Sequence, residues 1–169
     1  MSKRIVTFSI FLSVLTGGHA MAQENIYKLH SLFLYNFTKH IQWNNVDGDF
    51  TIGVFGNDIA LNVVKENLAN KKFGDKNIRV IRVAGLGDVK ASQLLYAPKS
   101  NKIKIIDLIS QSDLSNTLVV TEDDLIKEGA DISFFISGTR LNFKISKNQI
   151  EANGLKVSSA LLSLGENAD

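Results

Sequence analysis

The stretch that decides the fold is FTIGVFGNDIALNVVKENLAN, residues 50–70. Its first six residues are rich in β-formers and predict a buried strand at 50–55. Gly56 interrupts this pattern, and Asn57 or Asp58 is a natural N-cap for the amphipathic segment that follows, so a helix is predicted over 59–70. A strand that passes directly into a helix is the repeating unit of α/β proteins.

The same alternation continues towards the C-terminus. Further strands are predicted at 77–83, 93–97 and 116–121, with a helix at about 101–110. Thr121 and Asp124 form a capping-box pattern for a short helix that ends near Gly129.

The last part of the chain predicts a hairpin and closing helices. Residues 131–137 and 140–146 flank Gly138-Thr139, a two-residue turn with glycine placed for positive φ. Ser146 caps a helix to about Asn153, where Gly154 stops it, and 157–164 predict a closing amphipathic helix. The fold class expected is therefore a single α/β domain, with a mixed β-sheet flanked by helices on both faces.

The segment before the first strand predicts a helix over 24–42. At roughly 100° per residue, its apolar residues fall on one arc: Ile26, Leu29, Phe33, Phe37 and Ile41. The polar turn 44–49 ends it.

The N-terminus has the pattern of a secretory signal peptide over residues 1–22. Lys3 and Arg4 precede an apolar run, and Ala20-Met21-Ala22 supplies a small-x-small cleavage box. A membrane anchor is disfavoured, because a run of about 11 apolar residues is shorter than the roughly 20 that span a bilayer. We therefore expect export, cleavage after Ala22 and a periplasmic domain over 23–169.

Charge and cysteine content exclude several classes of function. Lys3 and Arg4 are the charged residues of 1–22, so 17 basic and 17 acidic residues of the chain's 19 and 17 remain. This neutral balance gives no support to a surface that binds nucleic acid or an anionic membrane. The chain has no cysteine, which excludes thiol chemistry and thiolate metal sites.

Catalytic and metal-binding patterns are weak. His30 and His40 are ten residues apart on one predicted helix, roughly 15 Å along its axis, so they cannot share a metal ion. The chain has no G-x-S-x-G sequence, and no serine can be paired with a base. We expect no enzymatic activity, no metal and no cofactor; a hydrolase ranks third among the functions considered.

The polar residues around the first helix are the candidates for a binding site. Lys39 and Trp43, one turn apart, could orient a carboxylate and anchor a partner, although Trp43 fits a core lid equally well. Asn36 could contact a ligand or be a buried amide tied to neighbouring backbone, which is favoured. Ser158 and Ser159 permit close helix packing or face a groove.

Four stretches, in order, resemble the YfiR family of small exported bacterial proteins. They are FLYNFTKHIQW at 33–43, FTIGVFGND at 50–58, GADISFFI at 129–136 and FKISKNQIEANGLKVSSALLSL at 143–164. Together they span nearly all of residues 26–164, and the weakest segment is 84–116.

The resemblance implies a periplasmic α/β domain, often dimeric, without established enzymatic activity. Its best-understood member holds an inner-membrane diguanylate cyclase in check and so lowers cyclic-di-GMP signalling. The expected partner is therefore the periplasmic domain of an inner-membrane signalling protein. The alternative is a periplasmic sensor or carrier of a small aromatic or acidic ligand, with an aromatic pocket near Trp43.

The chain departs from the family pattern at several positions. It lacks the family's usual cysteines, and His40 stands where the family usually has Phe. His30 replaces a usual Lys and Asn44 a usual Pro. We expect both histidines to be packing substitutions.

Overall fold

The computed structural model describes residues 17–99 and 102–169. Its helices are α1 (Gly17–His40), α2 (Asp58–Leu68), α3 (Leu86–Lys90), α4 (Lys102–Gln111), α5 (Lys147–Ala152) and α6 (Ser159–Leu162), with a 3-10 helix η1 (Ile126–Glu128). Its strands are β1 (Ile41–Gln42), β2 (Phe50–Phe55), β3 (Lys72–Phe73), β4 (Lys76–Val83), β5 (Leu94–Ala97), β6 (Leu118–Thr121), β7 (Ile132–Ser137), β8 (Arg140–Ile145), β9 (Lys156–Val157) and β10 (Glu166–Asn167).

The main sheet has the order β10-β8-β7-β6-β5-β2-β4-β3. Strands β4, β2, β5, β6 and β7 run parallel, and β8 returns antiparallel to β7 through the predicted two-residue turn, where Gly138 has a φ of 62°. The chain passes from β2 to β4 on one side and then to β5 on the other, so the winding reverses between β2 and β5. The predicted α/β domain with a mixed sheet is confirmed.

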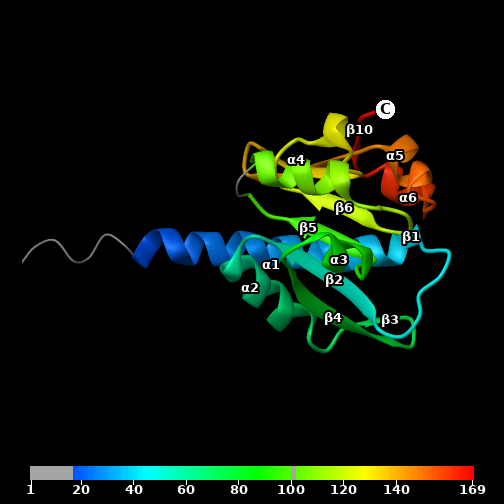
Figure 1. Ribbon diagram of the computed structural model, residues 1–169. Coiled ribbons are helices and arrows are strands. Elements are labelled where there is room, and N and C mark those ends of the chain that lie inside the picture. The colour runs from blue at the N-terminus through cyan, green and yellow to red at the C-terminus, as the bar shows by residue number, and fades with distance from the viewer. Residues whose placement is uncertain (1–16, 100–101) are drawn as a thin grey trace, which may run out of the picture.

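Helices cover both faces of the sheet. In Figure 1 the long helix α1 runs behind the strands while α3 and α4 lie in front. The core behind the sheet joins α1 and α2 through residues such as Leu34, Phe37 and Val64, and the core in front joins α3 and α4 through Val89 and Ile105.

The first helix ends at His40, two residues before the predicted end, because the next two residues form a strand. Ile41 and Gln42 pair antiparallel with Val157 and Lys156. This pairing takes residues 156–157 into β9, and the closing helix shrinks to α6, capped by Ser158.

The capping box predicted from Thr121 and Asp124 does not form. The Thr121 hydroxyl donates to the carbonyl of Asp123, and the Asp124 carboxylate accepts a 2.8 Å bond from Lys144 on β8. The segment forms the short η1 instead, which ends at Gly129 in the left-handed region, as predicted.

Most of the predicted signal peptide, residues 1–16, lies outside the described residues. Residues 17–22 belong to α1, so the helix runs continuously through the predicted cleavage position. Within residues 17–99 and 102–169, no helix combines the length and the apolar character that crossing a membrane requires. Cleavage after Ala22 stays a prediction.

Candidate ligand-binding site

A cavity of about 320 Å³ lies between α1 and the carboxyl ends of β5, β6 and β7. Its lining residues are Gln23, Ile26, Tyr27, His30, Lys99, Glu122, Phe134, Phe135, Ile136 and Leu141. In doubly wound sheets, ligands bind outside the carboxyl ends of the strands, near the point where the winding reverses. The cavity therefore lies on the side of the sheet where this fold class places its sites.

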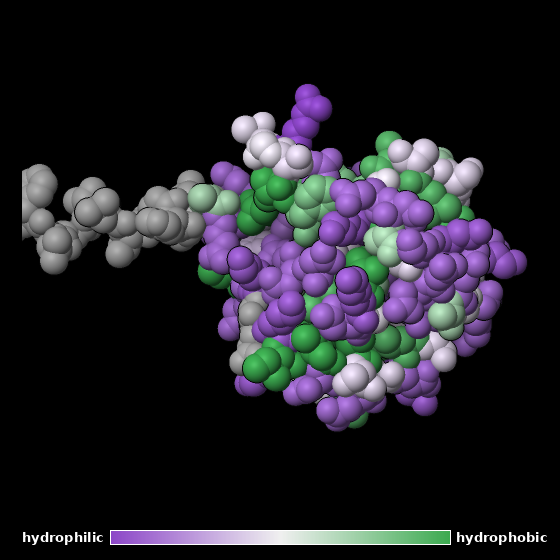
Figure 2. All heavy atoms as spheres, turned by 90° about the horizontal axis from the view of Figure 1, so that it is seen from above, coloured by the Kyte–Doolittle hydropathy of each residue, from purple (hydrophilic) through white to green (hydrophobic). Residues whose placement is uncertain are grey.

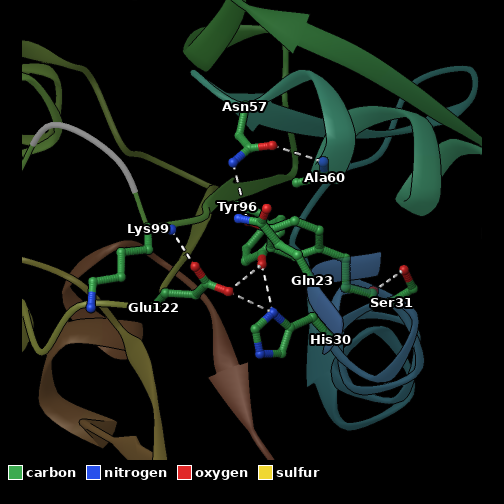
Figure 3. A network of polar contacts seen from close by, with 9 residues as sticks. Gln23, His30, Ser31, Asn57, Ala60, Tyr96, Lys99 and Glu122 are labelled. Atoms are coloured by element: carbon green, nitrogen blue, oxygen red, sulfur yellow. Dashed lines mark hydrogen bonds and ion pairs between the residues drawn. The ribbon is translucent and has the colours of Figure 1, made fainter. Parts of the chain in front are cut away.

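The polar end of the cavity is built around His30, which is 2% exposed. Its Nδ1 lies 2.7 Å from the Tyr96 hydroxyl and 3.0 Å from Oε1 of Glu122, and the Tyr96 hydroxyl donates to the same Oε1 at 3.3 Å (Figure 3). Three elements thus meet at one histidine nitrogen: α1, β5 and the residue that follows β6.

A second group of polar contacts surrounds Tyr27. Its hydroxyl accepts hydrogen bonds from Gln23 at 3.2 Å and from Asn57 at 3.1 Å. Asn57 is also the predicted N-cap of α2 and accepts a 2.9 Å bond from the backbone N–H of Ala60. The start of α2 is therefore joined to α1 at the cavity.

Both tyrosines stay protonated at neutral pH. Burial, and then the negative charge of Glu122, raise the pKa of Tyr96 well above its ordinary value, and the same two causes raise the pKa of Tyr27. Glu122 itself is held by the backbone N–H of Lys99, which donates to Oε2. The cavity thus has neutral hydroxyls around one carboxylate.

Helix spacing and ring packing fix the orientation of these side chains. Gln23, Tyr27 and His30 recur every three or four residues, which places them on one face of α1. The His30 ring stacks on Phe134 of β7, with centroids 4.5 Å apart and an interplanar angle of 2°. Buried ring contacts of this kind hold the imidazole in one plane.

A larger hollow of about 510 Å³ lies on the opposite face of the sheet, lined by residues that include Phe55, Gly85 and Leu86. Its charged residues, Lys104 and Asp107, are exposed. Because the buried side chains of Tyr27 and His30 and the half-buried Glu122 line the cavity beside His30, we take that cavity as the candidate site. The surface seen from above is mostly hydrophilic, with hydrophobic side chains gathered in separate patches (Figure 2).

The predicted site residues Asn36 and Lys39 lie on the outward face of α1. Both are exposed, so the expectation that Asn36 is a buried amide is wrong. The Lys39 ammonium lies 4.2 Å from the centroid of the Tyr35 ring one turn away. These two residues remain candidates for contact with a partner.

Trp43 does not continue the helix beyond Lys39, because β1 intervenes. It is 7% exposed, its Nε1 donates a 2.9 Å bond to the carbonyl of Gln93, and its ring packs edge-on against Phe50 and Phe73. This position matches the alternative in which Trp43 is a core lid. The aromatic cavity predicted near Trp43 is instead the one beside His30, whose lining does not include Trp43.

Ser158 and Ser159 lie at the start of α6, beside the end of α1. Ser158 Oγ lies 3.2 Å from Nδ1 of His40 and also accepts from the backbone N–H of Leu161 as the N-cap. The expectation that no serine can be paired with a base therefore needs correction. Across residues 17–99 and 102–169, no carboxylate is hydrogen-bonded to His40, so the third member of a catalytic triad is missing. Ser159 is exposed.

Sequence reasoning missed the residues that form the cavity. His30 is predicted to be a packing substitution, and Glu122 is not among the predicted site residues. The sequence offers one signal for these residues. Tyr96 lies near the carboxyl end of one predicted strand and Glu122 directly follows another, and the carboxyl ends of parallel strands meet at one edge of a sheet.

Comparison with known proteins gives a family and a fold. The family model described as YfiR/HmsC-like matches residues 27–166. A crystal structure of a conserved domain protein from Vibrio cholerae O1 biovar eltor str. N16961 has a TM-score of 0.57 and 14% sequence identity, and the match covers 85% of this chain and 60% of that one. The chain therefore spans less than two thirds of that protein, and the likeness is one of fold. No curated protein matches the sequence.

Proposed function

Because this chain belongs to the YfiR/HmsC-like family, we propose that it is a periplasmic regulatory protein that binds an inner-membrane diguanylate cyclase and holds it in check. The observation that carries the proposal is the family match over residues 27–166, which includes every strand of the sheet except the last residue of β10. The regulator acts by binding and needs no chemistry of its own.

The predicted signal peptide supports a periplasmic location. Cleavage after Ala22 leaves the whole family-matching segment in the mature protein, and Gln23 at the rim of the cavity becomes the first residue. Inhibition of a cyclase from this side of the membrane requires contact with the partner's periplasmic domain.

The outward face of α1 is the surface that we propose for this contact. Leu29, Leu32, Asn36 and Lys39 follow one another at spacings of three and four residues, and all four are exposed. Leu32 is 52% exposed, which is high for a leucine on a helix that is otherwise packed against the sheet. An apolar centre beside polar and cationic residues is typical of protein interfaces.

Photocrosslinking in the native periplasm tests this assignment. A photoreactive residue at position 32 should capture a membrane-bound cyclase, while the same residue at Ile103, which is 71% exposed on α4, should not. Deletion of the gene should raise cellular cyclic-di-GMP, and a Leu32→Asp variant should fail to lower it again. Equal capture from both positions, or unchanged cyclic-di-GMP, would contradict the proposal.

A second candidate function is small-molecule sensing. The cavity beside His30 favours it, because its volume of about 320 Å³ and its aromatic walls suit a small ligand. A sensor should gain thermal stability when its ligand is added.

A further inference from the structure

One ring nitrogen of the buried His30 has no hydrogen-bond partner among residues 17–99 and 102–169. Nδ1 is engaged by Tyr96 and Glu122, whereas Nε2 turns away from both (Figure 3). Among the described residues, no fully buried side-chain nitrogen or oxygen lacks a hydrogen-bond partner. Nε2 has no partner among them, so this nitrogen reaches the open space of the cavity.

The contacts of Nδ1 decide which atom carries the imidazole proton. An ionised carboxylate only accepts hydrogen bonds, and Oε1 of Glu122 lies 3.0 Å from Nδ1. An unprotonated Nδ1 would set its lone pair against that of the oxygen, so the proton belongs on Nδ1. In the neutral ring, Nε2 is then an acceptor that faces the cavity.

The charge at this end of the cavity is negative. The Glu122 side chain is 13% exposed and is held by a backbone N–H, a hydroxyl and the imidazole, none of which is a permanent cation. The walls beyond it are apolar or aromatic: Ile26, Phe134, Phe135, Ile136 and Leu141. An acceptor nitrogen on a ring whose other nitrogen contacts a carboxylate, together with aromatic faces, suits the binding of an ammonium group.

We propose that this cavity binds a small primary amine with an apolar or aromatic body. The ammonium group donates to Nε2 of His30, on the other side of the ring from the Glu122 carboxylate, and the body lies against Phe135, Ile136 and Leu141. The volume of about 320 Å³ accommodates a molecule of about one ring. This ligand class rests on the sensing function proposed above.

Lys99 favours the alternative ligand class, a carboxylate. Its side chain is exposed at the cavity, where its ammonium group could hold a carboxylate. A carboxylate ligand would need Lys99, whereas an amine is repelled by it. The two classes therefore predict opposite effects of a Lys99→Ala substitution.

Calorimetric titration of the purified protein with three matched compounds tests the proposal. Phenethylamine should bind at least about tenfold more tightly than 2-phenylethanol, which has the same shape without the charge, or 3-phenylpropanoate, which carries the opposite charge. Glu122→Gln should remove the preference for the amine over the alcohol, and Lys99→Ala should leave amine affinity equal or higher.

Three results would overturn the proposal. They are tighter binding of 3-phenylpropanoate that is lost in Lys99→Ala, equal binding of the amine and the alcohol, and no heat of binding for any compound. Circular dichroism of Glu122→Gln checks that the variant is folded. If the variant does not fold, the affinities of the wild-type protein for the three compounds test the proposal without it. Crosslinking from position 32 is measured separately, so a failed ligand site is distinguished from a failed partner interface.

Discussion

Nδ1 of His30 lies 2.7 Å from the hydroxyl of Tyr96, although 66 residues separate the two in the chain. The contact joins α1 to the sheet at the carboxyl end of β5, and Glu122 completes it from the end of β6. A buried polar cluster of this kind is stabilising only while each member keeps its partners. The cluster that offers a nitrogen to the cavity therefore also positions α1.

Removal of the Tyr96 hydroxyl should destabilise the protein. We expect Tyr96→Phe to lower the free energy of unfolding by about 1–2 kcal/mol, because Glu122 and His30 lose a shared partner in a buried site. Urea denaturation followed by the fluorescence of Trp43 measures the change. Tyr35→Phe is the matched control, since Tyr35 is half-buried and its ring meets solvent-exposed Lys39. Equal losses in the two variants would show that the cluster contributes nothing specific.

Trp43→Ala should lower the free energy of unfolding far more than the substitution of an exposed binding residue would. Trp43 packs edge-on against Phe50 and Phe73 and donates to the carbonyl of Gln93, so its removal leaves a cavity and takes away one of the two hydrogen bonds of that carbonyl, which also accepts from the backbone N–H of Leu118. We expect a loss of about 3–5 kcal/mol in the free energy of unfolding, measured by urea denaturation followed by circular dichroism. If Trp43→Ala unfolded cooperatively at the wild-type urea midpoint, Trp43 would be a surface anchor and not a core residue.

Local patterns in the sequence predicted the strands and helices that depend on neighbouring residues. The strand at 50–55, the Asn57 cap and the Gly138 turn follow from propensity and turn chemistry within a few positions. The pairing of Ile41–Gln42 with Lys156–Val157 joins residues more than a hundred positions apart. That pairing shortened both the first helix and the closing helix, and no local pattern specifies it.

The candidate site was harder to predict because its members are each ordinary in their own segment. His30 lies within an amphipathic helix, Tyr96 within an apolar strand and Glu122 within an acidic run. What makes them a site is the strand order, which brings the ends of β5 and β6 together beneath α1. The family resemblance was predicted from motif order, since each motif is contiguous in the chain.

Lys39→Ala should weaken capture of the membrane partner without loss of stability. Lys39 is exposed, and its contact is with the ring of Tyr35, so we expect a change below about 0.5 kcal/mol in the free energy of unfolding. Co-purification of the partner from solubilised membranes measures the effect on binding. Lys127→Ala, on η1, is the control for loss of one exposed positive charge. Wild-type recovery of the partner by Lys39→Ala would remove this residue from the interface.

Gly53→Ala should destabilise the sheet. A Cβ at this position would lie 2.5 Å from Cγ2 of Val83 and 2.6 Å from Oγ of Ser92, so β4 or the segment before β5 must move. We expect a cost of about 1–3 kcal/mol, measured by urea denaturation. Gly87→Ala is the matched control, because nothing lies within 4 Å of its Cβ and alanine favours the helix. A loss in Gly87→Ala as large as in Gly53→Ala would rule out the steric explanation.

Asp131 should make stability fall as the pH rises from about 4 to 7. Its carboxyl is buried, accepts hydrogen bonds from the backbone N–H of Val119 and from Asn153, and burial raises its pKa from 3.8 to about 7. Between these two values the folded protein binds a proton that the unfolded chain releases, so its contribution is fully present below the lower pKa and is lost as pH rises through the upper one.

The contribution of Asp131 should amount to roughly 1.4 kcal/mol per pH unit within that window. Urea denaturation at several pH values measures the slope. Asp131→Asn removes the titrating group, so its stability minus that of the wild type should grow more positive from pH 4 to pH 7. Asp107→Asn, at an exposed carboxylate, should follow the wild type throughout. A constant difference between Asp131→Asn and the wild type would mean that Asp131 has the same pKa in the folded and unfolded states.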